Sequence, residues 1–317
     1  MDTKLVRAGA GVLAGLATSA GATGVVLHFA RLSWGPVVLA ASGAPYLMGC
    51  ALLGAAVFAG MRHWVGVSAA AVVLAGAVWT QAPLYVARAD DGDGPVVTVM
   101  QANLLFDGAD PGALVELVRD REVAVLTVDE LTPGALAALG ASGLDELLPH
   151  RYVSPGRTAA GTGIWSRFPL SETVEYDGFV LNQLSATATV PGVGPVSVYA
   201  LHPVPPVYGV RVWADELRRL RQIIGRAPEG RPVIVGGDFN ATHDHAQFRA
   251  LTSGRFEDAA EQAGAGHLVT YPTDKRFPPV VGIDHVLVAG GRALSVQTVD
   301  LPGADHRALV ARVRLEA

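Results

Sequence analysis

The chain has 317 residues, half of them hydrophobic, and its mean hydropathy of +0.34 is high for a soluble protein. A formal net charge of −5 argues against strong non-specific binding to nucleic acid, which depends on Lys and Arg side chains that neutralise phosphates. The single cysteine, Cys50, excludes both an internal disulfide and a zinc site built from several cysteines.

Charged residues are distributed unevenly along the chain. Up to Arg88 the sequence holds one acid, Asp2, and five Lys or Arg residues. Of the 29 acids and 24 basic residues in the whole chain, 28 and 19 therefore remain for residues 89–317, a net charge of −9. The sequence predicts a membrane part over residues 1–88, an acidic linker over 89–94, and a soluble domain over 95–317.

Three apolar stretches in the first part, residues 8–30, 35–60 and 65–86, are long enough to cross a bilayer, which takes about 20 residues. We therefore expect about three transmembrane helices and contact with the lipid bilayer through residues 8–86. A cleaved signal peptide would still leave two spans, and a buried helical subdomain is the remaining alternative. The first stretch, residues 8–30, is rich in the small residues Gly, Ala, Ser and Thr, which suit close helix packing in lipid.

The orientation in the membrane follows from the Lys and Arg residues that flank these stretches. In an arrangement with three spans, one side carries three of them (Lys4, Arg7 and Arg62) and the other carries two (Arg31 and Arg88). The positive-inside rule then places the N-terminus in the cytoplasm. We expect a multi-pass protein of the cell membrane whose soluble domain is extracytoplasmic.

The soluble domain alternates strand and helix patterns. Strands are expected over residues 95–103, 123–131, 161–170, 195–206, 232–240, 282–290 and 305–316, where β-branched and apolar residues are concentrated. Residues 110–120 have apolar positions at helical spacing, with Asp110 as N-cap and Pro111 in the first turn. Residues 208–226 form a second amphipathic helix, whose basic run is typical of a solvated face, with contact to anionic lipid or phosphate as the alternative.

Acidic, amide and imidazole side chains stand at the beginning or just after the end of these strands. An acid beside a strand is most often a turn former or a helix cap, so each one taken alone indicates little. Together they supply only oxygen and imidazole groups, and a sheet can bring strand ends together in one cleft. The set comprises Asn103, Glu130, His202, Asp238, Asn240, Asp284, Asp305 and His306.

The ordered motifs "MQANLL", "DELTP", "GTGIWSR", "LHPVPP", "GGDFN", "GIDHVL" and "GADHRAL" resemble those of the endonuclease/exonuclease/phosphatase superfamily, which includes deoxyribonuclease-like and sphingomyelinase-like hydrolases. The resemblance covers about residues 95–317. Two positions depart from it: Asp129 stands where Gln is common and alters the local charge, and Ala304 stands where Ser is common. The resemblance implies an α/β (α+β) fold, a four-layer sandwich of two packed β-sheets flanked by helices.

The resemblance also implies a role for each residue of the set. Glu130, Asn103 and Asp305 would bind a divalent cation, and their oxygen ligands suit Mg²⁺ or Mn²⁺. Asp238 and Asn240, two apart in an extended stretch and so on one face, would orient the attacking water and hold a phosphate oxygen. His306 would contact the phosphate or activate water with Asp284 as its orienting partner, and His202 would stabilise developing charge. Whether Asp238 or His306 is the base stays open.

The implied function is metal-dependent hydrolysis of a phosphodiester, in nucleic acid or in a phospholipid headgroup. A catalytically silent, membrane-anchored module that binds a phosphate ligand is the alternative, and a transport role would need polar groups inside the spans. No protein partner can be inferred. His243 and His245 are expected to face solvent at a helix start, and His285 is expected to be structural.

Overall fold

The computed structural model describes residues 3–89 and 92–316, which form two compact units. The helical unit comprises Met1–Pro83 and His243–Ala246, and the sheet unit comprises Leu84–Thr242 and Gln247–Ala317. Residues 90 and 91 of the predicted acidic linker lie outside the described residues.

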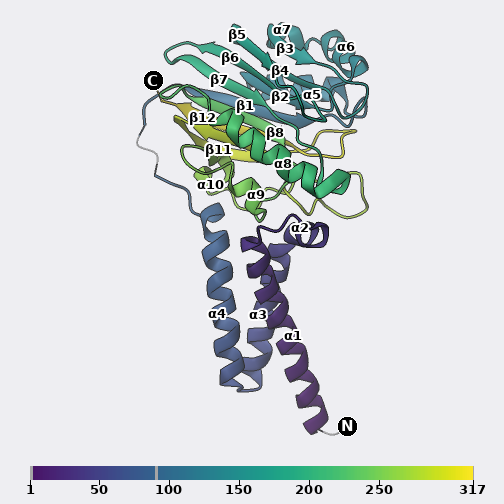
Figure 1. Cartoon of the computed structure of the whole chain (residues 1–317), viewed down its shortest axis with the longest axis vertical. Coiled ribbons are helices and arrows are strands. Elements are labelled where there is room, and N and C mark those ends of the chain that lie inside the picture. Colours follow the sequence, from purple (N-terminus) through teal and green to yellow (C-terminus); the bar gives the residue numbers. More distant parts are fainter. Residues whose placement is uncertain (1–2, 90–91, 317) are drawn as a thin grey trace. The chain divides into compact units, whose positions relative to one another are not determined.

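The helical unit contains α1 (Thr3–Phe29), α2 (Gly35–Ala41), α3 (Ala44–Gly60) and α4 (Trp64–Gln81), shown in Figure 1. Two helical stretches, Lys4–Phe29 and Trp64–Tyr85, are long and apolar enough to cross a membrane. The predicted middle stretch is broken, because α2 and α3 meet at a bend of 66°. Pro45 stands in the first turn of α3, where the N–H that proline lacks would have no acceptor within the helix, so α3 can begin as a separate helix. The unit has three spans if the bent pair forms one.

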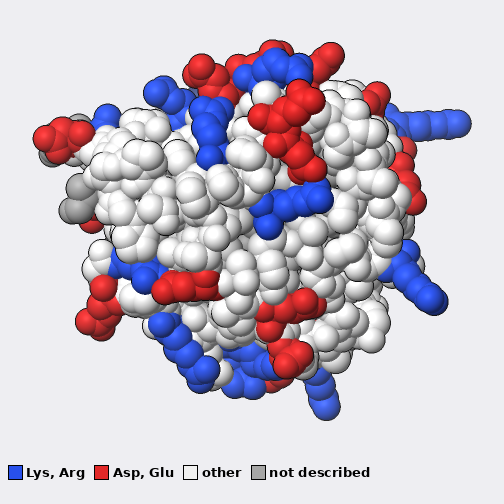
Figure 2. Space-filling model, turned by 90° about the horizontal axis from the view of Figure 1, so that it is seen from above, with Lys and Arg blue, Asp and Glu red and all other residues white. Residues whose placement is uncertain are grey.

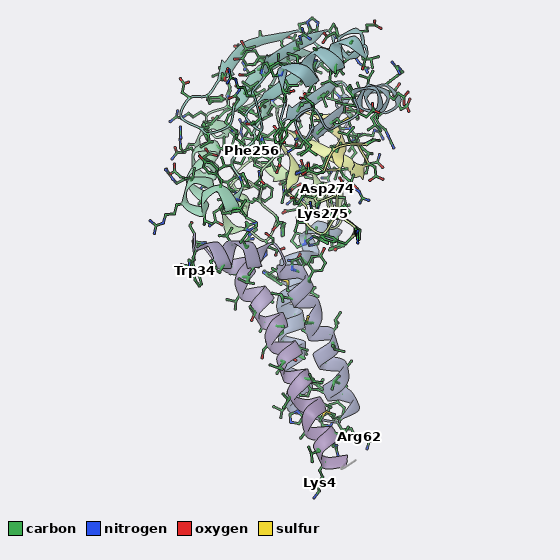
Figure 3. All side chains as sticks on the ribbon, turned by 90° about the vertical axis from the view of Figure 1, so that its right-hand side faces the viewer. Lys4, Trp34, Arg62, Phe256, Asp274 and Lys275 are labelled. Atoms are coloured by element: carbon green, nitrogen blue, oxygen red, sulfur yellow. The ribbon has the colours of Figure 1, made fainter. Side chains whose placement is uncertain are left out.

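Small residues allow the helices to pack closely. A Cβ atom on Gly54 of α3 would lie 2.3 Å from Thr18 Oγ1 of α1, so no larger residue fits there. At one end of the unit, Arg7 Nη2 donates a hydrogen bond of 3.0 Å to the carbonyl of Met61. Figure 3 shows Lys4 and Arg62 at that same end and Trp34 at the other.

The segment His243–Ala246 belongs to the helical unit, and the prediction that His243 and His245 face solvent is wrong. Both imidazoles are buried and contact backbone carbonyls of the helices. Asp244 is fully buried and binds His28 Nδ1 at 2.7 Å and Gln81 Nε2 at 2.9 Å. The local sequence could not reveal these contacts, because the partners lie more than 160 positions away along the chain.

Two six-stranded sheets form the centre of the sheet unit. The first has the order β11 (Gly291–Val299), β12 (Ala308–Leu315), β1 (Val96–Asn103), β2 (Val125–Asp129), β4 (Thr162–Ser166), β3 (His150–Ser154). The second has the order β5 (Leu170–Glu175), β6 (Leu184–Val190), β7 (Gly194–Ala200), β8 (Val233–Asp238), β10 (Asp284–Ala289), β9 (Glu257–Asp258). These packed sheets and their flanking helices confirm the predicted sandwich.

Apolar side chains hold the layers together. One buried cluster fills the space between the sheets and includes Val99, Ile234 and Val286. A second cluster, which includes Met100 and Trp165, packs the first sheet against α5 (Pro111–Asp120), α6 (Pro133–Ala141) and α7 (Leu144–Leu147). The remaining elements are α8 (Pro206–Ile224), α9 (Ala246–Arg249), α10 (Ala259–Ala263) and the short η1 (Ala82–Tyr85). The Asp110 side chain caps α5, as the sequence predicts, by accepting the Ala113 N–H at 3.1 Å.

Strand register brings the polar strand ends together. β1 and β2 run parallel with Asn103 beside Asp129, so Glu130 follows directly. β8 and β10 run antiparallel with Asp238 opposite Asp284. The last residues of three strands and the first residues of β10 and β12 therefore lie at one edge of the sandwich.

Candidate active site

All eight residues singled out from the sequence belong to the sheet unit and lie at or next to strand ends. Asn103 and Asp238 end β1 and β8, Glu130 follows β2, and His202 and Asn240 follow β7 and β8. Asp284 begins β10, and Asp305 and His306 precede β12. The contacts below join them into one cluster.

The Asp238 carboxylate lies at the centre of this cluster and is 2% exposed. Its Oδ2 atom accepts a hydrogen bond from Asn103 Nδ2 at 3.2 Å. The same oxygen lies 3.7 Å from His202 Nε2 and 3.7 Å from His306 Nε2. A carboxylate between two imidazoles gives a site where a proton can be accepted and negative charge can be stabilised.

His306 is held in one orientation by two neighbours. Its Nδ1 atom pairs with Asp284 Oδ2 at 2.8 Å, and its ring contacts Tyr271 with the ring centroids 4.8 Å apart. The opposite nitrogen, Nε2, faces Asp238 and lies 4.0 Å from Asp305 Oδ1. The Asp284 carboxylate thus holds the His306 ring through Nδ1, an arrangement similar to the acid–histidine pair of a catalytic triad.

The charges of the central groups follow from these contacts. Burial alone would lower the pKa of His306, but the negative Asp284 and Asp238 outweigh it and raise the pKa to about 10. Burial raises the pKa of Asp238 to about 7, although His306 opposes the shift. Burial and the positive His306 lower the pKa of His202 to about 4. At neutral pH, His306 is therefore a cation and His202 a neutral hydrogen-bonding group.

The raised pKa of His306 predicts a pH-dependent stability for the metal-free protein. A histidine whose folded pKa exceeds its unfolded value of 6.5 stabilises the fold fully below that value, and the contribution disappears as the pH rises towards about 10. We expect the melting temperature of chelator-treated protein to fall between pH 7 and 10, and to fall less in His306→Gln. Scanning fluorimetry measures these melting temperatures. An equal fall in the wild type and in His306→Gln would contradict the raised pKa of His306.

Two site residues have a backbone conformation that is rare outside glycine. Glu130 has φ 58° and Asn240 has φ 49°, both in the left-handed region. Such conformations persist only where surrounding contacts enforce them and are concentrated at functional sites. They place the Glu130 side chain directly after β2 and turn the chain sharply after β8.

The expectation that Asp238 and Asn240 lie in one extended stretch is wrong. β8 ends at Asp238, whose Oδ1 atom accepts the main-chain N–H of Asn240 at 2.8 Å and so closes an Asx turn. The Asn240 side chain donates to the Pro203 carbonyl at 3.1 Å, next to His202. The turn, rather than strand alternation, brings the acid and the amide to the same edge.

Glu130, Asn103 and Asp305 fit a divalent cation by their chemistry. Glu130 Oε2 is buried and has no hydrogen-bond partner within residues 3–89 and 92–316. Burial raises the pKa of Glu130, a hydrogen bond from Asn103 opposes the shift, and the nearby Asp305 adds to it. Burial also raises the pKa of Asp305, against the opposing His306. A cation would satisfy the unpartnered oxygen and relieve the repulsion between the acids.

A second possible cation position exists in the same cluster. One ligand atom each from Asp238, Asp284 and His306 lie within 4.8 Å of one another. Both sets are partly engaged within the protein: His306 Nδ1 pairs with Asp284 Oδ2 at 2.8 Å, and Asn103 Oδ1 accepts the Leu105 N–H at 3.0 Å. The set of Glu130, Asn103 and Asp305 offers oxygen ligands alone, which suit Mg²⁺ or Mn²⁺.

Three supporting residues carry no signal in the sequence. Gln183 accepts the His202 N–H at 2.8 Å and donates to the His202 carbonyl at 2.6 Å, which fixes that backbone. Tyr271 contacts the His306 ring, and the Thr273 N–H binds the Asp305 carbonyl at 2.8 Å. None stands in a motif, and their spacing from the site residues is irregular.

His285 and Ala304 have structural surroundings. His285 binds Asp258 Oδ2 at 2.7 Å and the Ala241 carbonyl at 2.9 Å, and it lies in the buried interior as a structural residue should. Ala304 is buried in the second apolar cluster. Its methyl group therefore suits a position where the resembling motif has a serine.

Solved structures share this architecture. The humanized D. rerio TDP2 is 18% identical with a TM-score of 0.59, covering 69% of this chain and 99% of that chain. An endonuclease/exonuclease/phosphatase from Beutenbergia cavernae is 19% identical with a TM-score of 0.57, covering 70% and 72%. The mannosyl-6-phosphatase Bt3783 of Bacteroides thetaiotaomicron is 16% identical with a TM-score of 0.54, covering 68% and 99%. At these identities the likeness shows the fold alone.

Among curated proteins, none matches the chain. The sequence profile described as Endonuclease/Exonuclease/phosphatase family matches residues 100–306, which include all the site residues described above. Members of this family are hydrolases that act on phosphoester bonds. This chain belongs to the Endonuclease/Exonuclease/phosphatase family.

Proposed function

We propose that the chain is a membrane-anchored, divalent-metal-dependent phosphoesterase that hydrolyses a phosphodiester by attack of water. The observation that carries the proposal is the Asp238 carboxylate, whose Oδ2 atom lies 3.7 Å from two imidazoles, one of them fixed by Asp284. Phosphodiester hydrolysis needs an activated water and positive or hydrogen-bonding groups around the phosphate oxygens. The cluster supplies both.

Each residue has a proposed role. Asp238 accepts a proton from the attacking water, and Asn240 binds a phosphate oxygen. His306, kept charged by flanking carboxylates, stabilises negative charge on the phosphate, and the neutral His202 donates a hydrogen bond. Glu130, Asn103 and Asp305 would hold Mg²⁺ or Mn²⁺, and such an ion supplies charge neutralisation at the phosphate.

We assign residues 1–88 to the membrane, residues 89–94 to a linker and residues 95–317 to catalysis. Apolar helices long enough to span a bilayer support the anchor. The location of Lys4 and Arg62 at one end of the helical unit supports a cytoplasmic N-terminus under the positive-inside rule. The sheet unit would then lie outside the cytoplasm.

The substrate is a phosphodiester of nucleic acid or of a lipid headgroup. One similar structure, D. rerio TDP2, is described in complex with a single-strand DNA product, and another similar protein is a mannosyl-6-phosphatase. On the face seen in Figure 2, acidic and basic side chains are interleaved without a broad basic area. With a net charge of −9 over residues 89–317, this pattern gives little support to non-specific DNA binding.

A substrate panel on the full-length chain in detergent tests the proposal. We expect Mn²⁺- or Mg²⁺-dependent hydrolysis of bis(4-nitrophenyl) phosphate and of one natural class among plasmid DNA, RNA, sphingomyelin and inositol phosphates. A chelator should abolish the activity and added metal should restore it.

Two variants serve as controls for the panel. Asp238→Asn removes the proposed base while keeping the side-chain shape, and Glu229→Ala removes an exposed carboxylate outside the cluster. Hydrolysis that survives in the first variant, or no hydrolysis of any phosphoester by the wild type, would contradict the proposal. Binding of phosphate compounds without turnover would favour the silent binding module.

A further inference from the structure

A buried polar chain joins the two sheets next to Asp238. Thr127 on β2 donates to the Gln101 side-chain carbonyl on β1, and the Gln101 amide donates to Asp129 Oδ2 at 2.7 Å. The same Asp129 oxygen accepts the main-chain N–H of Asp238 at 2.8 Å. Thr127, Gln101 and Asp129 are fully buried. This series of hydrogen bonds therefore connects the first sheet to β8 in the second sheet.

The two glycines before Asp238 allow β8 to approach this polar chain. A Cβ atom on Gly236 would lie 2.1 Å from Thr127 Oγ1, and one on Gly237 would lie 1.9 Å from the Leu201 carbonyl oxygen. Both separations are too short for any side chain. Gly236 thus lets the backbone of β8 lie close to Thr127 of β2, and Gly237 lets it lie close to Leu201, which follows β7.

Asp129 supplies an acceptor where regular pairing on one side of β8 has ended. The parallel ladder between β7 and β8 ends with Ala200 beside Gly236, two residues before Asp238. An N–H buried without an acceptor is costly. Of the two Asp129 oxygens, Oδ2 receives both hydrogen bonds, while Oδ1 is buried without a hydrogen-bond partner.

We infer that Asp129 is a positioning residue for the proposed reaction: its Oδ2 atom holds the Asp238 main chain so that the Asp238 carboxylate lies between His202 and His306. The inference rests on the proposed function for its catalytic consequence, whereas the contact itself can be tested without a substrate. Asp129 acts through Asp238 and does not need to touch the substrate.

Two substitutions that keep a similar side-chain volume show whether the hydrogen-bond acceptor at position 129 is what matters. Asp129→Asn keeps a carbonyl oxygen that can accept both hydrogen bonds. Asp129→Leu keeps the volume but leaves the Asp238 N–H and the Gln101 amide buried without an acceptor. We expect the first variant to keep the wild-type kcat. The second should lose about 10²-fold in kcat, the cost of a displacement of about 1 Å in a catalytic group, with KM little changed.

A double-mutant cycle distinguishes positioning from a general structural role. If Asp129 acts through Asp238, then Asp129→Leu should cost almost nothing further in kcat when Asp238→Asn is already present. Thr127→Val, an isosteric change on the same strand, is the matched control and should reduce kcat far less than Asp129→Leu. Additive losses in the cycle would overturn the inference.

Hydrogen exchange at the Asp238 amide tests the contact independently of turnover. Exchange should be accelerated in Asp129→Leu and unchanged in Asp129→Asn relative to the full-length wild type. If the wild type hydrolyses no phosphodiester, the proposed function fails while this measurement still decides the contact. Wild-type exchange in Asp129→Leu, or losses of kcat and protection in a folded Asp129→Asn protein, would overturn the inference even if the leucine variant does not fold.

Discussion

Replacing either His306 or Asp238 with alanine should lower kcat for the phosphodiester substrate by at least about 10²-fold, the lower range for loss of a general acid–base contribution. In His306→Ala, the Asp284 carboxylate loses its 2.8 Å partner and the phosphate loses a cationic neighbour. In Asp238→Ala, the attacking water loses its proton acceptor. Steady-state kinetics on the full-length chain at saturating Mg²⁺ measure both losses.

The losses should not add when both residues are replaced, because both groups act on one phosphate within a single cluster. His285→Gln provides a matched control, since His285 is also a buried histidine paired with an acid, Asp258, but serves a structural contact. His285→Gln should lower the melting temperature but should change kcat far less than His306→Ala does. Near-wild-type turnover in His306→Ala or in Asp238→Ala would remove the mechanism proposed above.

Replacing Glu130 with alanine should raise the Mg²⁺ concentration needed for half-maximal activity by about 10–100-fold or more. Loss of a group that merely supports a metal ligand already costs this much in affinity. The physical reason is the loss of the buried Oε2 atom, which has no hydrogen-bond partner among the residues that the structure describes. Activity titrated with Mg²⁺ after chelator treatment measures the shift.

Glu130→Gln separates charge from geometry at this position. The amide keeps one oxygen ligand but removes the negative charge, so its Mg²⁺ requirement should lie between those of the wild type and the alanine variant. An unchanged Mg²⁺ requirement in Glu130→Ala would exclude this residue as a ligand.

Much of the sheet unit could be predicted from local sequence patterns. The helix at 110–120 was predictable because its cap and its apolar spacing are both local signals, and the structure has the Asp110 cap. The long buried strands, such as β8, were predictable because apolar runs favour them. Strands β3, β5, β6, β9 and β11 and the short helices α6, α7, α9 and α10 were not predicted. Of these, β3 is only half-buried and β11 alternates irregularly around a bulge, so neither carries a regular strand pattern.

The cluster of site residues was predictable as a set but not in its details. Strand ends carry the polar residues, and ordered motifs select them, so Asp238, Asp284 and His306 could be expected to lie together. The contact from Asp129 to the Asp238 N–H could not be predicted, because it depends on how strands of different sheets pack together. The Asx turn at Asp238 is a local contact of a kind that Asp favours, but the apolar run before it predicts a strand that continues through residue 240. The burial of Asp244 depends on contacts with helices far away in the sequence.

The position of a bound Mn²⁺ ion tests the account most directly. Anomalous diffraction from crystals of the full-length chain grown with Mn²⁺ would locate the ion without reference to activity. We predict a peak bounded by Glu130, Asn103 and Asp305, with the His306–Asp284 pair intact beside it. A peak held instead by Asp238, Asp284 and His306, or none near any of these residues, would contradict the account.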